Sequence, residues 1–168
     1  MRVLGIDPAL RTTGFGLIDW DGKKFILVSA GTISTSDRQP MPARLLRINT
    51  AVGRLAGQFK PDVCVLEKVF AHYRHPATAF ILGQARGAIC LACASARIPV
   101  AEYAATRVKK ALTGKGLASK AQVQRTVASL LGLKVLPRRF DVTDALALAV
   151  SFCYLAKGEQ LKRHSFGE

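Results

Sequence analysis

The order of strand and helix patterns along the chain leaves few folds open. Three short strands come first, and Asp21-Gly22 is typical of a tight hairpin turn between the second and the third. A helical stripe then leads into 62–67, a continuous apolar run typical of a strand buried on both faces. Because this strand follows a helix, we expect it to run parallel to a strand already in the sheet.

The predicted elements cover most of the 168 residues. Strands are expected at 2–6, 14–20, 24–33, 62–67 and 99–103, and helices at about 42–59, 76–96, 105–112, 119–131 and 141–157. This order predicts an α/β fold whose five-stranded mixed sheet, three antiparallel strands followed by two parallel ones, is flanked by helices. We expect a single domain over residues 1–157 and a flexible C-terminal tail over 158–168.

The chain is strongly basic, with 25 Lys and Arg residues against 11 Asp and Glu residues and a formal net charge of +14. Such a surface attracts polyanions at long range, and nucleic acid is the obvious ligand.

A membrane is not expected, because the most apolar stretch, 77–105, is interrupted by Arg86 and Arg97. The chain runs directly into its first strand, so we expect no signal peptide and a cytoplasmic protein.

The four cysteines form no extracellular disulfide framework. Cys90 and Cys93 make a CxxC sequence in an alanine-rich helical run, without a second pair at the spacing of a zinc site. Cys64 and Cys153 also lie in apolar runs. We interpret all four as small buried hydrophobic residues.

Four acidic residues fall at the ends of predicted elements, and each has an ordinary structural explanation. Asp7, before Pro8, could be a turn residue, and Glu67 could be a solvated strand end. Asp141 and Asp144 have the spacing of a helix N-cap and its N3 partner.

Considered together, the same four acids predict one site. If the strand ending at Glu67 lies beside the first strand, Asp7 and Glu67 reach the same edge of the sheet, where ligand sites of α/β folds form. Asp141 and Asp144 share one helix face that could close over them. Clustered carboxylates repel one another and raise each other's pKa unless a cation lies between them. A pair of Mg²⁺ ions held by such hard oxygen ligands hydrolyses phosphodiesters.

Five segments follow one another along the chain: Gly5-Ile6-Asp7-Pro8, Thr13-Gly14-Phe15-Gly16, Glu67-Lys68-Val69-Phe70, Leu82-Gly83-Gln84-Ala85-Arg86-Gly87, and Asp141 through Leu148. In this order they resemble the RuvC family of bacterial Holliday-junction resolvases, which have the RNase H-like, or retroviral-integrase, fold. The resemblance covers nearly the whole chain and is missing only in the tail.

The resemblance implies a cytoplasmic bacterial endonuclease that acts as a homodimer. Such an enzyme nicks two opposed strands of a four-way DNA junction and leaves 5′-phosphate and 3′-hydroxyl ends. It implies two Mg²⁺ ions per active site, which Mn²⁺ can replace, with Asp7, Glu67, Asp141 and Asp144 as ligands. It also implies the RuvA and RuvB branch-migration proteins as partners.

DNA contacts are implied as well. Lys109 and Lys120 match basic residues near the scissile phosphate, and Phe70 matches an aromatic residue that meets unstacked bases at the crossover. Lys115 and Arg74, each in a loop, complete the expected DNA-binding set. The ordinary alternatives are general phosphate contacts for the lysines and a place in the core for Phe70.

One loop departs from the family pattern. Where family members often carry an Asn after the aromatic residue, this chain has His72-Tyr73-Arg74-His75. We interpret the two histidines as solvated rather than as metal ligands.

Three other functions remain open. An ATP-binding domain of the actin and sugar-kinase type also begins with a strand, an Asp and a Gly-rich hairpin, but it needs two such domains. A junction-binding module would use the acids only as caps and turns. An RNase H-like nuclease for RNA-DNA hybrids or flaps would keep the fold and change the substrate.

A dimer surface can also be suggested. The apolar helix at 76–96 carries Phe80, Leu82, Ile89 and Leu91, which span more of its circumference than one sheet can cover.

Overall fold

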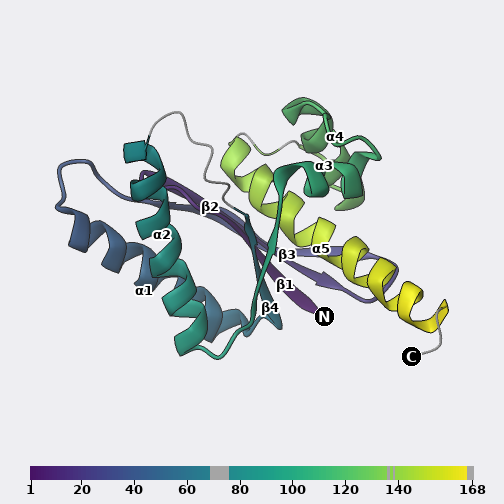
Figure 1. Ribbon diagram of the computed structural model, residues 1–168, viewed down its shortest axis with the longest axis horizontal. Helices are drawn as coiled ribbons and strands as arrows, with labels where there is room; N and C mark the ends of the chain where they lie inside the picture. The colour runs from purple at the N-terminus through teal and green to yellow at the C-terminus, as the bar shows by residue number, and fades with distance from the viewer. Residues whose placement is uncertain (69–75, 136, 138, 166–168) are drawn as a thin grey trace.

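A five-stranded mixed sheet lies at the centre of the molecule, in the order β3-β2-β1-β4-β5 (Figure 1). The computed structural model describes the backbone of residues 1–68, 76–135, 137 and 139–165, and the side chains of these residues except 76, 77 and 158–165. The first three strands are antiparallel, whereas β4 is parallel to β1 and β5 is parallel to β4. The predicted sheet is therefore confirmed. Its strands are β1 (Arg2–Asp7), β2 (Thr12–Trp20), β3 (Phe25–Ser34), β4 (Val63–Glu67) and β5 (Val100–Tyr103).

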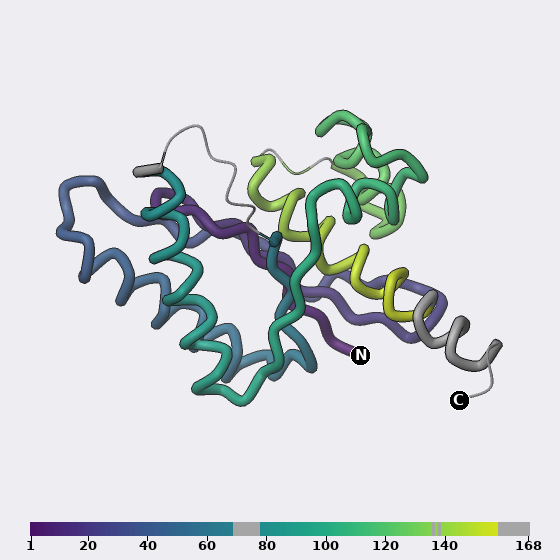
Figure 2. The backbone as a smooth tube through the Cα atoms, in the orientation of Figure 1, coloured from purple at the N-terminus to yellow at the C-terminus, as the bar shows by residue number. Residues whose placement is uncertain are grey.

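Helices cover both faces of the sheet. They are α1 (Met41–Phe59), α2 (Pro76–Ser95), α3 (Ala105–Thr113), α4 (Lys120–Leu130) and α5 (Phe140–Ser165). Figures 1 and 2 show α1 and α2 together on one side of the sheet, with α3, α4 and α5 on the other. Two apolar clusters correspond to these two layers, one on each face of the sheet.

The two-residue period of the central strands decides which side chains face which layer. In β1, Val3 packs in the cluster with α3, α4 and α5, whereas Leu4 and Ile6 pack in the cluster with α1 and α2. The same period places Asp7 on the α5 face, together with Val3. In β4, Val63 and Val65 pack on the α5 face, so Glu67 belongs to that face as well.

The last helix is longer than predicted. Its backbone remains helical to Ser165, eight residues past the predicted end at Lys157. Gly158 suggested a stop, but a single glycine costs a helix only about 1 kcal/mol and no proline follows it. The proposed boundary at 157 is therefore not a helix end.

Helix α2 exposes several large apolar side chains. Phe80 is 77% exposed and Leu91 62% exposed, whereas Ile89 is fully buried in the core beneath the sheet. The sheet therefore covers only part of the apolar circumference of this helix, the part that carries Ile89, and leaves Phe80 and Leu91 exposed. By length and composition alone the Thr78–Ser95 segment could cross a membrane, a property that it shares with core helices of soluble proteins.

The cysteines occupy the predicted apolar positions. Cys64, Cys93 and Cys153 are buried, and Cys90 is partly buried. Cys64 and Cys93 belong to the cluster under α1 and α2, and Cys153 belongs to the cluster under α5. Their predicted role as small core residues accounts for these positions.

Candidate active site

Asp7 and Glu67 leave adjacent parallel strands at the same edge of the sheet. The register between β1 and β4 pairs Ile6 with Leu66, so the next residue of each strand is one of the two acids. Both acids lie on the face that α5 covers, because both follow the alternation of their strands. The predicted adjacency of these two strand ends is thus present in the fold.

Glycines allow the start of α5 to approach this edge. A Cβ at Gly14 of β2 would overlap the main-chain carbonyl of Asp141, and a Cβ at Gly5 of β1 would overlap that of Ala145. Only residues without a side chain can lie under the helix at these positions. The close approach carries Asp141 and Asp144 toward the strand ends.

A pocket of about 220 Å³ joins two of the acids to two lysines. Glu67 and Asp144 line it together with Lys109 of α3 and Lys120 of α4. The Lys120 Nζ atom lies 3.3 Å from Asp144 Oδ2.

The position of Lys120 has a local cause. Ser119 caps α4 in a reciprocal capping box with Gln122, which fixes the first helical turn where Lys120 stands.

The carboxylates act on one another electrostatically. The pKa of Asp7 is raised to about 7, first by burial and then by the charges of Asp144, Glu67 and Asp141, in that order, against the opposing charge of Lys120. The pKa of Glu67 is also raised, first by burial and then by Asp144. The four acids from three elements therefore share one electrostatic site.

Asp7 and Asp141 do not occupy the capping positions that the sequence suggested. The turn after β1 is closed by Thr13, whose Oγ1 donates a 2.6 Å hydrogen bond to the carbonyl oxygen of Ala9, and not by Asp7. Helix α5 begins at Phe140, so Asp141 lies inside its first turn rather than at the N-cap.

The donor set suits a hard divalent cation. Among the residues that the structure describes, the pocket lining contains carboxylates but no His or Cys, and carboxylate oxygens are the ligands that Mg²⁺ prefers. Within the described residues, no three His, Cys, Asp or Glu side chains are positioned to hold a metal ion as they stand.

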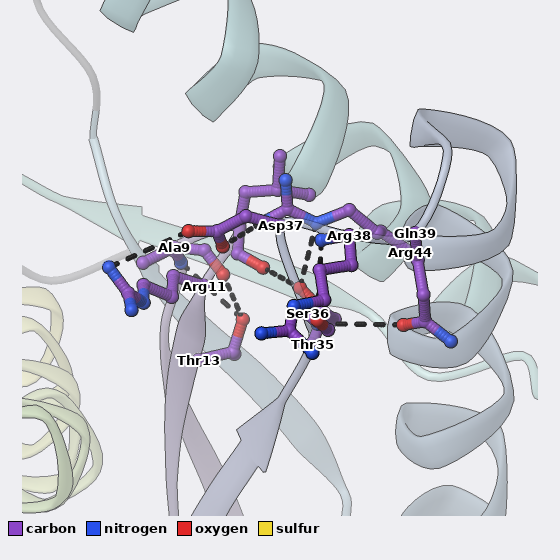
Figure 3. A network of polar contacts seen from close by, with 10 residues as sticks. Ala9, Arg11, Thr13, Thr35, Ser36, Asp37, Arg38, Gln39 and Arg44 are labelled. Atoms are coloured by element: carbon purple, nitrogen blue, oxygen red, sulfur yellow. Dashed lines mark hydrogen bonds and ion pairs between the residues drawn. The ribbon is translucent and has the colours of Figure 1, made fainter.

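The loop that follows Asp7 is held by a polar network (Figure 3). The Thr35 amide donates a 3.0 Å hydrogen bond to the carbonyl oxygen of Arg11, and the Arg44 Nε donates one of 2.9 Å to Thr35 Oγ1. Asp37 pairs with Arg11 at 3.6 Å and with Arg44 at 3.5 Å. These contacts tie the β1–β2 loop to the segment between β3 and α1 and restrain the main chain beside Asp7.

The predicted DNA-binding residues divide into three groups. Lys109 and Lys120 line the acidic pocket. Lys115, in the loop between α3 and α4, lines a separate pocket of about 420 Å³ together with Arg125 of α4. Phe70 and Arg74, with the rest of the 72–75 loop, lie outside the residues that the structure describes.

Arg86 and Glu102 lie near the site but are not among the predicted site residues, although Arg86 belongs to one of the segments that carry the family resemblance. Arg86 of α2 contacts the main chain of Glu67 and the carboxylate of Glu102 on β5. The available signal was an arginine that interrupts the most apolar stretch of the chain. Its partners, however, lie 19 and 16 residues away and come together only in the fold.

Comparisons with known proteins agree with this geometry. A family model described as "Crossover junction endodeoxyribonuclease RuvC" matches residues 3–152. A protein of that name from Methylococcus capsulatus is 47% identical over 164 residues, which are 98% of this chain and 96% of the relative. Another, from Rhodopirellula baltica, is 43% identical over 154 residues, 92% of this chain and 86% of the relative.

Solved structures give the same result. The structure of Thermus thermophilus RuvC has a TM-score of 0.88 at 35% identity and covers 95% of this chain and 97% of its own. The T. thermophilus RuvC in complex with Holliday junction substrate has a TM-score of 0.87 at 33% identity, covering 94% and 96%. With its fold, its four acids at one sheet edge and these matches over nearly its full length, the chain belongs to the RuvC family of crossover junction endodeoxyribonucleases.

Proposed function

We propose that this protein resolves four-way DNA junctions by nicking two opposed strands in a metal-dependent reaction. The observation that supports this most strongly is the common electrostatic site of Asp7, Glu67, Asp141 and Asp144, in a chain of net charge +14. A basic surface attracts the DNA, whereas a local cluster of acids has no affinity for phosphate without cations. The four acids are therefore suited to bind metal ions in an enzyme that acts on nucleic acid.

The four acids would hold two Mg²⁺ ions, which Mn²⁺ can replace. When bound, such a pair supplies an activated water and stabilises the leaving 3′ oxygen. The contribution of the chain is to present ionised oxygens at one sheet edge. Because the pKa of Asp7 is about 7 in the metal-free protein, cation binding is coupled to loss of a proton from this site.

Lys109 and Lys120 would act on the scissile phosphate. Both line the pocket with Glu67 and Asp144, and both lower the pKa of Glu67. A fixed ammonium group beside the reacting phosphate stabilises the negative charge that develops on its oxygens. Lys115 and Arg125, in the neighbouring pocket, would contact phosphates farther from the cleavage point. Phe70 and Arg74 keep their proposed role at the crossover by resemblance alone.

A homodimer would place two such sites on one junction. Helix α2 supports this, because Phe80 and Leu91 are exposed and Leu91 borders an apolar groove with Leu45 and Leu46 of α1. Exposed apolar patches of this kind are typical of protein interfaces. Symmetric nicking of opposed strands follows naturally from a two-fold axis.

The remaining proposals rest on the family resemblance. They are RuvA and RuvB as branch-migration partners and a bacterial source. The single nuclease domain over residues 1–157 and the cytoplasmic location rest on the length and pattern of the sequence as well.

Substrate preference provides the test. Cleavage of a four-way junction, a linear duplex and an RNA-DNA hybrid should be compared at one salt and one Mg²⁺ concentration, because a basic protein binds any nucleic acid at low salt. We expect paired nicks in the junction only. Asp7→Asn should abolish these nicks while leaving junction binding intact. Preferential hydrolysis of the hybrid would instead assign the chain to another RNase H-like activity, and cleavage by Asp7→Asn would overturn the metal-site assignment.

A further inference from the structure

Arg86 connects helix α2 to the ends of β4 and β5. Its Nη1 donates a 2.7 Å hydrogen bond to the main-chain carbonyl oxygen of Glu67. Its Nη2 pairs with the carboxylate of Glu102 on β5, which lies beside Leu66 in the sheet. The Arg86 side chain is only 15% exposed, so two polar partners compensate its removal from water.

The Glu67 carbonyl lies where the strand ladder ends. On one side, the paired register of β1 and β4 stops at Ile6 and Leu66, and β1 is followed by Pro8, which has no N–H to donate. On the other side, the Lys68 amide donates a 2.8 Å hydrogen bond to the carbonyl oxygen of Tyr103. Arg86 thus supplies a donor to the strand end from outside the sheet.

The position of Arg86 is itself fixed by packing. Its neighbour Ala85 and, one turn later, Ile89 are fully buried between α2 and the sheet. A guanidinium group is planar and presents its donors in a rigid fork, so it can hold the carbonyl and the Glu102 carboxylate at a fixed relative position. Lysine has neither property.

We propose that Arg86 is a positioning residue for Glu67, holding the main chain of this acid so that its carboxylate points into the pocket shared with Asp144. The proposal rests on the proposed function, because it takes Glu67 as a metal ligand. The cations that lower the pKa of the Glu67 carboxylate are Lys120 and Lys109. Arg86 contacts the main chain, so its effect is on geometry. Loss of a residue that orients a metal ligand typically weakens metal binding about 10–100-fold.

The experiment measures Mn²⁺ binding directly, by titration calorimetry and by the EPR signal of free Mn²⁺, in the absence of DNA. Arg86→Gln should bind Mn²⁺ about 10–100-fold more weakly than the wild type. Arg86→Lys, which can keep one hydrogen bond but not the fork, should fall between the two. Arg97→Gln is the matched control, because Arg97 is an exposed arginine in the turn after α2, at the opposite end of the sheet.

Cleavage assays separate orientation from general damage. The Mn²⁺ concentration that gives half-maximal junction cleavage should rise in Arg86→Gln by the same factor as the dissociation constant. Junction binding in EDTA should stay within about twofold of the wild type, because Arg86 is largely buried. A variant that is merely unstable would instead lose junction binding and its unfolding transition together.

A second substitution keeps the test decisive if Arg86→Gln fails to fold. Glu102→Ala removes a carboxylate that is 44% exposed and leaves Arg86 with one fixed partner, so Mn²⁺ binding should weaken several-fold. Folded Arg86→Gln or Glu102→Ala protein with wild-type Mn²⁺ affinity would overturn the proposal. Asp7→Asn distinguishes this outcome from failure of the proposed function. If Asp7→Asn also binds Mn²⁺ normally, the metal site itself is misassigned, whereas loss of binding in Asp7→Asn alone rejects only the role of Arg86.

Discussion

Gly14 of β2 lies directly beneath the main chain of Asp141, so that a Cβ at position 14 would overlap the Asp141 carbonyl oxygen. Gly5 has the same relationship to Ala145, one turn farther along α5. The depth at which this helix sits on the sheet is therefore set by residues that lack side chains. That depth determines how close Asp141 and Asp144 come to Asp7.

Replacing Gly14 by alanine should push the first turn of α5 away from β2. We expect unfolding free energy to fall by about 1–3 kcal/mol, the usual cost of overpacking. The rate of junction cleavage should fall about 100-fold, because displacement of catalytic groups by about 1 Å has effects of that size. Denaturant unfolding and single-turnover cleavage measure the two quantities.

Gly57→Ala provides the control for this prediction. Gly57 lies in α1, and a Cβ there would meet no atom within 4 Å. An alanine at an open helical position should stabilise the protein by about 0.5–1 kcal/mol and leave cleavage unchanged. Wild-type cleavage by Gly14→Ala would show that the helix depth does not control the site.

Asp7→Asn should stabilise the metal-free protein at alkaline pH. The pKa of Asp7 is raised from 3.8 to about 7, so the folded state holds the proton more tightly than the unfolded state. The wild-type protein therefore loses the stabilising contribution of protonated Asp7 as pH rises from about 4 to about 7. The Asp7→Asn variant does not lose it, because asparagine does not ionise. In EDTA at pH 8, Asp7→Asn should be more stable on the order of 1–4 kcal/mol.

Mg²⁺ should reverse that ranking. The wild type gains stability from a bound cation, most strongly at pH 8 where no proton has to be displaced, whereas Asp7→Asn gains little. Thermal unfolding of the wild type and of Asp7→Asn, at pH 5 and at pH 8 and in EDTA or in Mg²⁺, measures these differences in stability. Equal stability of the two proteins in EDTA at pH 8 would contradict the raised pKa.

Lys120→Met should alter the pH dependence of cleavage. The charge of Lys120 lowers the pKa of both Asp7 and Glu67. Without it, both carboxylates ionise at higher pH, and the rising limb of the pH–rate profile moves in the alkaline direction. Cleavage at pH 7 should fall at least about tenfold, the size of effect expected from losing electrostatic stabilisation of the phosphate.

Lys115→Met is the matched comparison for Lys120→Met. Lys115 lines the separate pocket between α3 and α4. Loss of Lys115 should weaken junction binding and lower the slope of log binding constant against log salt concentration by about the amount of one phosphate contact. The pH–rate profile should not move. Identical profiles for both variants would show that Lys120 is only a general phosphate contact.

Charge on the exposed face of α2 should separate the proposed dimer. Phe80→Glu with Leu91→Glu introduces two carboxylates where the side chains are 77% and 62% exposed, so the monomer fold should survive. We expect monomers by light scattering, and nicks that no longer occur in pairs. Leu117→Glu serves as the control, because Leu117 is 94% exposed in the loop before α4 and lies outside this face. Dimers that survive the double substitution would place the interface elsewhere.

Sequence periodicity accounted for the strands and helices because it reflects local rules. The apolar run at 62–67 predicted a strand buried on both faces, which the structure contains as β4 (Val63–Glu67), and the preceding helix predicted its parallel arrangement. The end of α5 was not predicted, since one glycine is a weak stop signal when the surrounding sequence favours a helix.

The sequence by itself determined that Asp7 and Glu67 stand at the ends of strands, because strand alternation and the order of elements are local properties of the chain. The tertiary structure alone decided how the remaining groups meet them. Gly14 lets Asp141 approach across a distance of 127 residues, Lys120 rather than Lys115 faces Asp144, and Arg86 reaches the main chain of Glu67. These relationships depend on packing between elements far apart in sequence, and no local periodicity encodes them.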